Sequence, residues 1–275
     1  MCWQTVHSGL VTHNATNCQY RTLPQCLQLV CPFASKGPSH TGEPFLATVE
    51  NHLIELLPRK DRQRLLAICK PVALELGEVL CETGELTRHV YFPTDGFISL
   101  IAHVSGSPGL EVGMVGIEGM LGSQLVLGGT ASPLHALVQG TGTAWQIRAR
   151  EFRSALAESP ALQRILNRYV LVLMAQLTSS AACLRFHLIE QRLARWLLMS
   201  QDRAHSDSFR VTHEFLAYML GVRRVGITAA AGALQRSGLI EYHRGALRVL
   251  DRRGLEAAAC GCYATDHAAY QKLLP

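Results

Sequence analysis

Residues 211–245 read VTHEFLAYMLGVRRVGITAAAGALQRSGLIEYHRG, and this stretch decides the fold of the carboxy-terminal third. Thr212 is a residue type that caps helices, because its hydroxyl accepts a hydrogen bond from an amide of the first turn. An apolar stripe at helical spacing follows, made of Phe215, Leu216, Met219 and Leu220. Gly221 lies where a tight turn needs a left-handed backbone, and a second helix fits residues 222–238. This order predicts a DNA-binding helix-turn-helix.

Two short apolar stretches come after the second helix. Residues 239–242 and 246–250 have the character of strands, and His243-Arg244-Gly245 lies between them as a basic turn. A helix-turn-helix followed by such a hairpin is typical of a winged helix, whose wing tip reaches the phosphate backbone. The alternative is a plain helical hairpin with solvated arginines, and the hairpin with its basic tip argues against it.

The charge is unevenly distributed along the chain. Between Arg185 and Arg253 there are 12 arginines and no lysine against 6 acidic residues, a net charge of +6, whereas the whole chain carries +5. The rest of the chain is therefore close to neutral. A basic third on a neutral remainder is expected of a nucleic-acid-binding module attached to a regulatory body. A solvated basic face without a ligand is the weaker interpretation.

The central part changes from helix to strands and back to helix. Residues 51–69 predict a short helical region interrupted by Pro58. Strand-like segments with glycine turns follow over residues 72–147, and Asp95-Gly96 has the sequence of a hairpin turn. Their spacing predicts an antiparallel barrel or jelly roll. Helices are expected over 149–158 and from Pro160 without interruption to about Arg203.

The long helix carries an apolar pattern with alternating steps of three and four residues. The residues concerned are Leu162, Ile165, Tyr169, Val172 and Gln176. Because a coiled-coil seam has this spacing, we expect the seam to form a homodimer. A helix that packs only on its own domain is the alternative. Dimerisation is favoured because two readers can then contact two half-sites about one DNA turn apart.

The nine cysteines are odd in number and scattered, without a CxxC pair. No secretory signal is evident, and no run approaches the roughly 20 apolar residues that span a bilayer. We therefore expect a cytoplasmic protein with reduced thiols and no membrane partner. Residues 1–45 look like a poorly ordered extension. A cluster on Cys18, Cys26 and Cys31 is the alternative there, but the spacing does not fit familiar cluster loops.

The chain from about residue 46 to 250 resembles the Crp–Fnr superfamily of bacterial transcription regulators. Thr212 to Gly245 can be laid on the family's DNA-binding region without a gap, and Gly77-Glu78 and Tyr91-Phe92 match its β-roll more loosely. The resemblance implies an α+β fold, a cytoplasmic homodimer, and double-stranded promoter DNA and RNA polymerase as partners. Its domains would be a 1–45 extension, a 46–158 cyclic-nucleotide-binding-like β-roll, a 159–184 dimerisation helix, a 185–253 winged helix and a 254–275 tail.

The sensor region departs from family members that bind cyclic AMP. Those members have an arginine–serine pair that holds the cyclic phosphate, whereas this chain has Ser132-Pro133 at that point. A buried anion without a charged partner is costly, so cyclic AMP is not expected as the effector. Glu118, Ser132 and His135 are the candidate residues of a pocket for another effector. An empty, structural pocket is the alternative.

The second helix of the DNA-binding motif also differs from the family's usual pattern. Arg224 retains the guanidinium group that can donate two hydrogen bonds to guanine. Val225, Thr228 and Ala229 suggest apolar contacts with bases. Arg223 lies about 100° around the helix from Arg224 and should face a phosphate. The other expected phosphate contacts are Thr212, His213, His243 and Arg244.

We expect no enzyme activity, cofactor or metal site. The histidines lack metal-ligand spacing, and no GxSxG, P-loop or GxGxxG element is present. A cupin-like metal enzyme using Glu118 and His135 is the weak enzymatic alternative. Cys260 and Cys262 form a CxC pair that can bind metal or react with oxidants, but two thiols in a tail are more often inert. The other functional alternative is a sensor or interaction protein that responds to a small effector or redox signal, with weak or no DNA binding.

Overall fold

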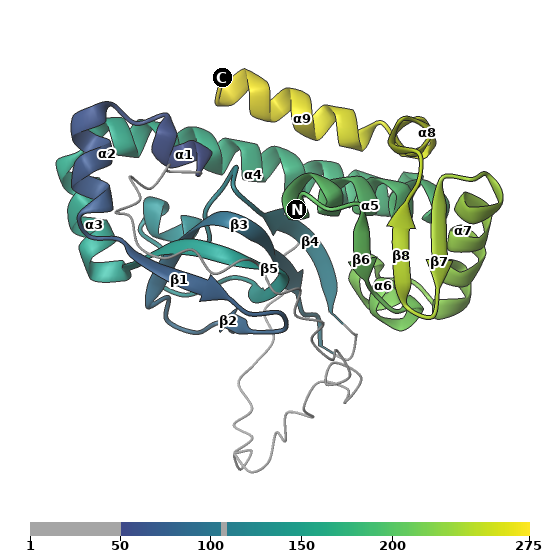
Figure 1. Ribbon diagram of the computed structural model, residues 1–275. Coiled ribbons are helices and arrows are strands. Elements are labelled where there is room, and N and C mark those ends of the chain that lie inside the picture. The colour runs from purple at the N-terminus through teal and green to yellow at the C-terminus, as the bar shows by residue number, and fades with distance from the viewer. Residues whose placement is uncertain (1–50, 106–108) are drawn as a thin grey trace, which may run out of the picture. The chain divides into compact units, whose positions relative to one another are not determined.

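The computed structural model describes residues 51–105 and 109–275. The expectations for residues 1–45, including the alternative cluster on three cysteines, lie outside the described residues. The described part is a mixed helix and strand structure, as the sequence predicts, with antiparallel sheets and helices in the order shown in Figure 1.

Two short helices open the described chain and an antiparallel sheet follows. The helices are α1 (His52–Glu55) and α2 (Arg59–Leu66), with Pro58 between them as the cap of α2. The strands are β1 (Lys70–Leu74), β2 (Val79–Cys81), β3 (His89–Ala102), β4 (Leu110–Val115) and β5 (His135–Arg148). They are hydrogen-bonded in the order β1-β5-β3-β4, and β2 also pairs with β5. A short 3-10 helix, η2 (Ser123–Leu127), lies between β4 and β5.

The expected hairpin at Asp95-Gly96 is wrong. Both residues lie inside the 14-residue strand β3, which pairs with β5 on either side of them through a series of register shifts. Gly96 has φ +71, and a side chain there would clash with the carbonyl oxygen of Gly140 on β5. The glycine is therefore part of a β-bulge that bends the strand. An Asp-Gly dipeptide can thus mark a bulge as well as a hairpin turn.

The helices after the sheet differ from expectation in one place. Helix α3 (Ala149–Glu158) ends at Ser159, which caps α4 (Pro160–Phe186) by accepting a hydrogen bond from the Leu162 amide. The chain then breaks at His187, whose backbone is extended, before α5 (Ile189–Ala204) begins. The uninterrupted helix expected from Pro160 to Arg203 is therefore two helices with a joint between them.

The carboxy-terminal part is a winged helix. Strand β6 (Ser208–Arg210) precedes α6 (His213–Leu220) and α7 (Arg224–Arg236), and then the hairpin of β7 (Ile240–His243) and β8 (Ala246–Val249) follows. Strand β6 pairs with β8, which makes a three-stranded sheet where the sequence predicts two strands. The apolar core of this part continues into the five-stranded sheet of β1–β5, called the β-roll below, because Phe97, Ile101 and Met114 pack in the same cluster as Leu216 and Ile227.

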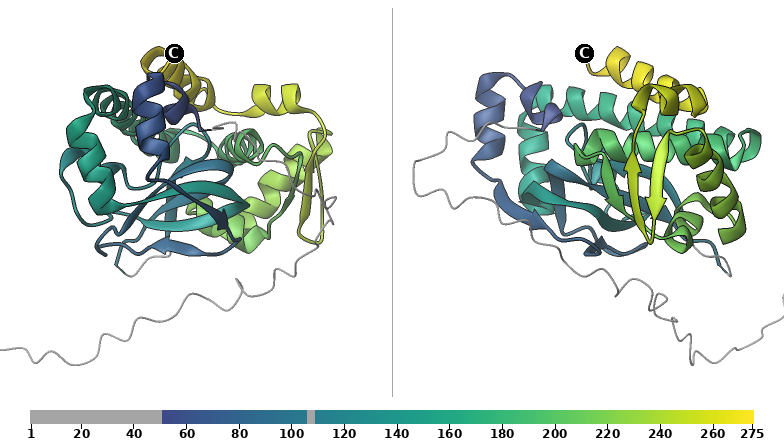
Figure 2. Two further views of the ribbon diagram at one scale, coloured as in Figure 1. Left: turned by 60° about the vertical axis from the view of Figure 1, so that its left-hand side comes forward. Right: turned by 45° about the vertical axis from the view of Figure 1, so that its right-hand side comes forward.

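Two helices close the chain: α8 (Arg252–Ala258) and α9 (Cys262–Leu273). Helix α9 is absent from the sequence-based prediction. It runs beside α4, as all views in Figures 1 and 2 show. The Tyr270 hydroxyl donates to the Glu118 carbonyl at 2.7 Å, and Leu274 is buried. The tail is therefore an integral layer of the fold.

Candidate nucleic-acid interface

The turn between α6 and α7 has the geometry that the sequence predicts. The Thr212 hydroxyl accepts a hydrogen bond from the Phe215 amide at 3.0 Å and so caps α6. Gly221 ends that helix with φ +62, a conformation that side chains disfavour. Ala217 and Leu220 of α6 and Ile227 of α7 are buried between the helices. This packing fixes the direction in which α7 leaves the turn.

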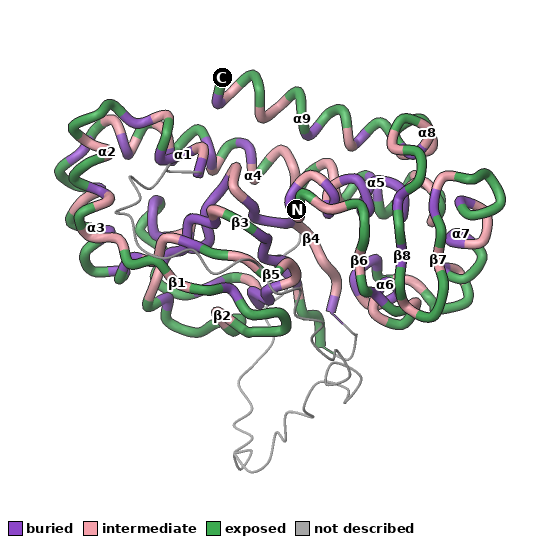
Figure 3. The backbone as a smooth tube through the Cα atoms, viewed as in Figure 1, coloured by how far each residue is buried: buried purple, intermediate pink, exposed green. Residues whose placement is uncertain are grey.

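The first two turns of α7 present an exposed row of side chains. Helix α7 alternates between buried and exposed residues, as Figure 3 shows. The exposed row consists of Arg223, Arg224, Val225, Thr228 and Ala229. Val225 is 72% exposed, which is unusual for a valine and leaves an apolar group available to a partner. Every base-contacting residue expected from the sequence is therefore on one accessible helix end.

His213 contacts both α7 and the wing within its own chain. Its Nδ1 lies 3.0 Å from the Thr228 hydroxyl, and its Nε2 is buried with no hydrogen-bond partner among the described residues. The ring packs on Tyr242 at 4.7 Å between centroids. Burial, and secondarily the charge of Arg224, lowers the pKa of His213 below its usual range. His213 thus joins α6, α7 and the wing, and its contact with a phosphate stays a prediction.

The wing tip is a tight turn with two positive-φ residues. Arg244 has φ +47 and Gly245 has φ +83, as the twist of a two-residue hairpin requires. The His243 and Arg244 side chains are exposed at this tip. The Tyr242 hydroxyl donates to the Val211 carbonyl at 2.7 Å and ties the wing to the segment that enters α6. The basic tip is therefore held at a defined place relative to α7.

The three expected effector residues do not form one pocket. Glu118 binds Arg203 of α5, with its carboxylate 2.8 Å from Nε and 2.7 Å from Nη2. It is thus committed to holding the β-roll loop against the DNA-binding part. His135 is buried and pairs with Glu82 at 2.8 Å. Only Ser132 lines the cavity of this region, and its hydroxyl donates to the Leu134 carbonyl at 2.7 Å.

The cavity beside Ser132 is small and contains residues that the sequence comparison missed. Its volume is about 100 Å³, and Arg88 and Gln124 belong to its lining. Arg88 directly precedes β3. It lies far in sequence from Ser132-Pro133, the point at which the family has its phosphate-holding arginine. Gln124 on η2 donates to the Thr87 hydroxyl at 2.6 Å. Ligand pockets for drug-sized molecules usually measure about 300–1,000 Å³, so this cavity is below that size.

Three of the five expected dimer-seam residues are buried in their own chain. Leu162, Tyr169 and Val172 are buried against the β-roll and α1–α3, whereas Ile165 and Gln176 are partly exposed. The large apolar side chains of α4 that are exposed are other residues of the helix. Leu171 is 51%, Met174 58%, Leu177 43% and Leu184 38% exposed. By length and composition alone, α4 is the one helix in the described ranges that could cross a membrane.

Comparison with known proteins agrees with this geometry. Residues 191–258 match the model of the Crp-like helix-turn-helix domain. No curated protein sequence matches the chain.

Solved structures with the same fold include FixK2 from Bradyrhizobium japonicum, with a TM-score of 0.59 at 14% identity over 70% of this chain and 98% of that one. The c-di-GMP-responsive global regulator CLP of Xanthomonas campestris has a TM-score of 0.59 at 16% identity, over 70% of this chain and 100% of that one. A CRP/FNR-family transcriptional regulator from Thermus thermophilus has a TM-score of 0.57 at 20% identity, over 69% of this chain and 98% of that one.

The helix-turn-helix domain and the shared fold together define a DNA-binding module on a β-roll. Residues 191–258 therefore belong to the Crp-like helix-turn-helix domain family, and the chain shares its fold with solved regulators of the CRP/FNR family.

Proposed function

We propose that the protein is a homodimer that binds a palindromic promoter site through α7 and the wing, and that cyclic AMP does not control it. The exposed row at the start of α7, with Arg224 beside the apolar Val225, is the observation that carries this proposal. Arginine donates two hydrogen bonds to guanine, and apolar groups contact thymine methyls. RNA polymerase would be the second partner, and the cytoplasm the place of action.

The dimer contact that we propose is the exposed side of α4. Met174, Leu177, Ala181 and Leu184 are exposed and follow one another in steps of three and four. This is the spacing of a coiled-coil seam, turned around the helix from the seam predicted by sequence. The apolar composition of α4 then serves two protein contacts, one with its own β-roll and one with a second copy. A membrane span is not needed to explain it.

Independence from cyclic AMP rests on the cavity. A volume of about 100 Å³ is too small for a nucleotide without rearrangement of its walls. Arg88 supplies a positive charge there, so a small anion is a better match than a nucleotide. The division into a sensor over residues 46–158 and a DNA-binding part from 185 to 253 belongs to the same proposal.

The experiment is selection of bound duplexes from a randomised DNA library, followed by sequencing and by measurement of the protein's mass in solution. We expect an inverted repeat with half-site centres about 10 base pairs apart, or a multiple of that, and a dimer on it. Retention of DNA without any preferred sequence, or no retention at low salt, would instead support the sensor or interaction protein with weak or no DNA binding.

A further inference from the structure

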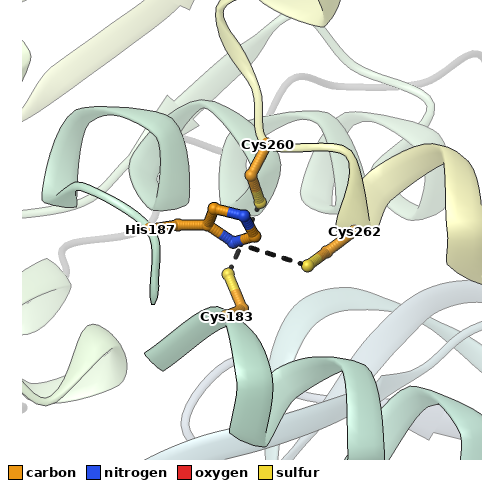
Figure 4. A group of neighbouring side chains, drawn as sticks. All are labelled: Cys183, His187, Cys260 and Cys262. Carbon is orange, nitrogen blue, oxygen red and sulfur yellow. Dashed lines mark hydrogen bonds between the residues drawn. The ribbon is translucent and has the colours of Figure 1, made fainter. Parts of the chain in front are cut away.

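Four potential metal ligands meet at the joint between α4 and α5. Cys183 comes from the last turns of α4, His187 from the joint itself, and Cys260 and Cys262 from the link between α8 and α9. Figure 4 shows the three sulfurs arranged around the His187 ring. One ligand atom of each residue lies within 4.8 Å of those of the other three. The three cysteines are buried and form a small cluster of their own.

We propose that these residues form a tetrahedral Cys₃His site for a divalent metal ion, with zinc as the natural occupant. The observed separations are close to those such a site requires. The Cys183 and Cys260 sulfurs are 3.4 Å apart, and the Cys262 sulfur is 3.6 Å from the His187 Nδ1. Zinc–sulfur bonds of about 2.3 Å in a tetrahedron put neighbouring sulfurs roughly 3.8 Å apart. Small side-chain shifts are enough to complete that geometry.

The surroundings favour an anionic metal complex. Zinc with three thiolates and a neutral imidazole carries one net negative charge, after three thiol protons have passed to solvent. Arg192 and Arg195 of α5 face Cys183 and Cys260, whose charges act favourably on both guanidinium groups. Arg195 is anchored to Asp266 of α9 at 2.6 Å.

The composition of the site favours zinc over other occupants. Soft thiolates with one imidazole in a closed tetrahedron are a known structural zinc set. The four ligand atoms lie within 4.8 Å of one another, which suits one metal ion, whereas a cluster of several irons needs more room between its ligands. All four residues lie outside residues 191–258, so the site is not part of what the domain model spans. Bound metal would join α4, the α4–α5 joint and the carboxy-terminal tail at one point.

The first test is the metal content of the full chain, purified with a reductant and without chelators. We expect about one zinc per chain, and less than about one tenth of that in a Cys183→Ser, Cys260→Ser double variant. Cys69→Ser and Cys81→Ser are matched controls, because these cysteines lie in the described chain outside the cluster, and they should keep the metal. Zinc that persists in the double variant would overturn the proposal.

A second measurement does not depend on the folding of a variant. Cobalt added to the metal-free wild type should give the visible bands of tetrahedral Co²⁺ and thiolate-to-metal charge transfer. Alkylation mapped by mass spectrometry should then find Cys183, Cys260 and Cys262 protected with metal and reactive after chelation. The inference would be overturned by a wild type that takes up neither zinc nor cobalt, by iron with inorganic sulfide at these residues, or by a Cys183–Cys260 disulfide in reduced preparations.

Discussion

Two adjacent arginines at the start of α7 differ in position, and this difference predicts different roles. Arg224 is the first residue of the helix and Arg223 is its cap, and both side chains are exposed. The two residues are separated by about 100° around the helix axis. If α7 enters the major groove, one guanidinium faces base edges and the other the flanking phosphate.

Substitution of these arginines should therefore have effects of different kinds. Arg224→Ala should cost roughly 1–3 kcal/mol on the selected operator and abolish discrimination at one base pair per half-site. Arg223→Ala should weaken binding to all DNA sequences alike. It should also reduce, by about one, the slope of the logarithm of the binding constant against the logarithm of the salt concentration. Binding is measured on an operator library at several salt concentrations, with Arg150→Ala on α3 as the control for loss of one exposed charge. Unchanged base preferences in Arg224→Ala would show that the assigned reader is wrong.

The elements that the sequence predicted well are those specified by neighbours in the chain. The Thr212 cap, the Gly221 turn and the Arg244-Gly245 hairpin each depend on a few consecutive residues, and each is confirmed. The bulge at Gly96 looked like a hairpin because both need a glycine with positive φ, and only the pairing with β5 distinguishes them. The residues next to Gly96 do not show that this segment pairs with β5, which lies far away in the sequence.

Long-range partners explain the other differences. Glu118 binds Arg203, which lies 85 residues away, and Cys183 meets Cys260, which lies 77 residues away. Neither pair has a signal in sequence spacing. Three residues of the predicted α4 seam are buried in their own chain, because both sides of the helix are apolar and periodicity alone could not distinguish the side on the β-roll from the exposed side. The His187 break was missed because no proline or glycine marks it. Helix α9 follows Gly261, but its apolar residues show little helical periodicity.

The exposed side of α4 gives a prediction at the scale of one element. Leu177→Glu should produce monomers at concentrations where the wild type is dimeric, because an unpaired carboxylate at the seam is costly to bury. The dissociation constant should rise by at least about 100-fold. Leu76→Glu is the matched control, since Leu76 and Leu177 are 42% and 43% exposed. Sedimentation velocity measures the oligomeric state of both variants. If Leu177→Glu were still dimeric, the dimer contact would not involve the exposed side of α4.

At the scale of the whole molecule, the sensor cavity predicts how the protein responds to nucleotides. Cyclic AMP at millimolar concentration should change neither the melting temperature nor the affinity for DNA, because the cavity measures only about 100 Å³. A ligand at a hundredfold excess over its dissociation constant would stabilise the native state by about 2.7 kcal/mol. Thermal unfolding with and without the nucleotide measures this directly. A clear shift that disappears in Arg88→Ala would show that Arg88 holds the phosphate and that the cavity opens.

The β-roll and the DNA-binding part are joined by a partly buried carboxylate as well as by their common core. Glu111 on β4 accepts hydrogen bonds from Ser99 at 2.5 Å and from Trp196 of α5 at 2.9 Å. Burial raises the pKa of Glu111 to about 7, although these hydrogen bonds oppose the shift. Between pH 4.5 and about 7, the Glu111 carboxyl therefore stays protonated in the folded protein, whereas it is ionised in the unfolded chain.

This difference in proton binding sets the sign of a pH effect. Between pH 4.5 and about 7 the folded state binds more protons at Glu111, so the free energy of unfolding contributed by this group falls as the pH rises. The loss should reach up to about 3 kcal/mol and stop above the folded pKa. Glu111→Gln keeps an acceptor for Trp196 but cannot ionise, so its stability should be less sensitive to pH than that of the wild type. Urea unfolding at about pH 5 and pH 8 measures the slope, with Glu55→Gln at an exposed carboxylate as the control. If Glu111→Gln retained the wild-type slope, the pH dependence would arise elsewhere, and Glu111 would be ionised in the folded protein at both pH values.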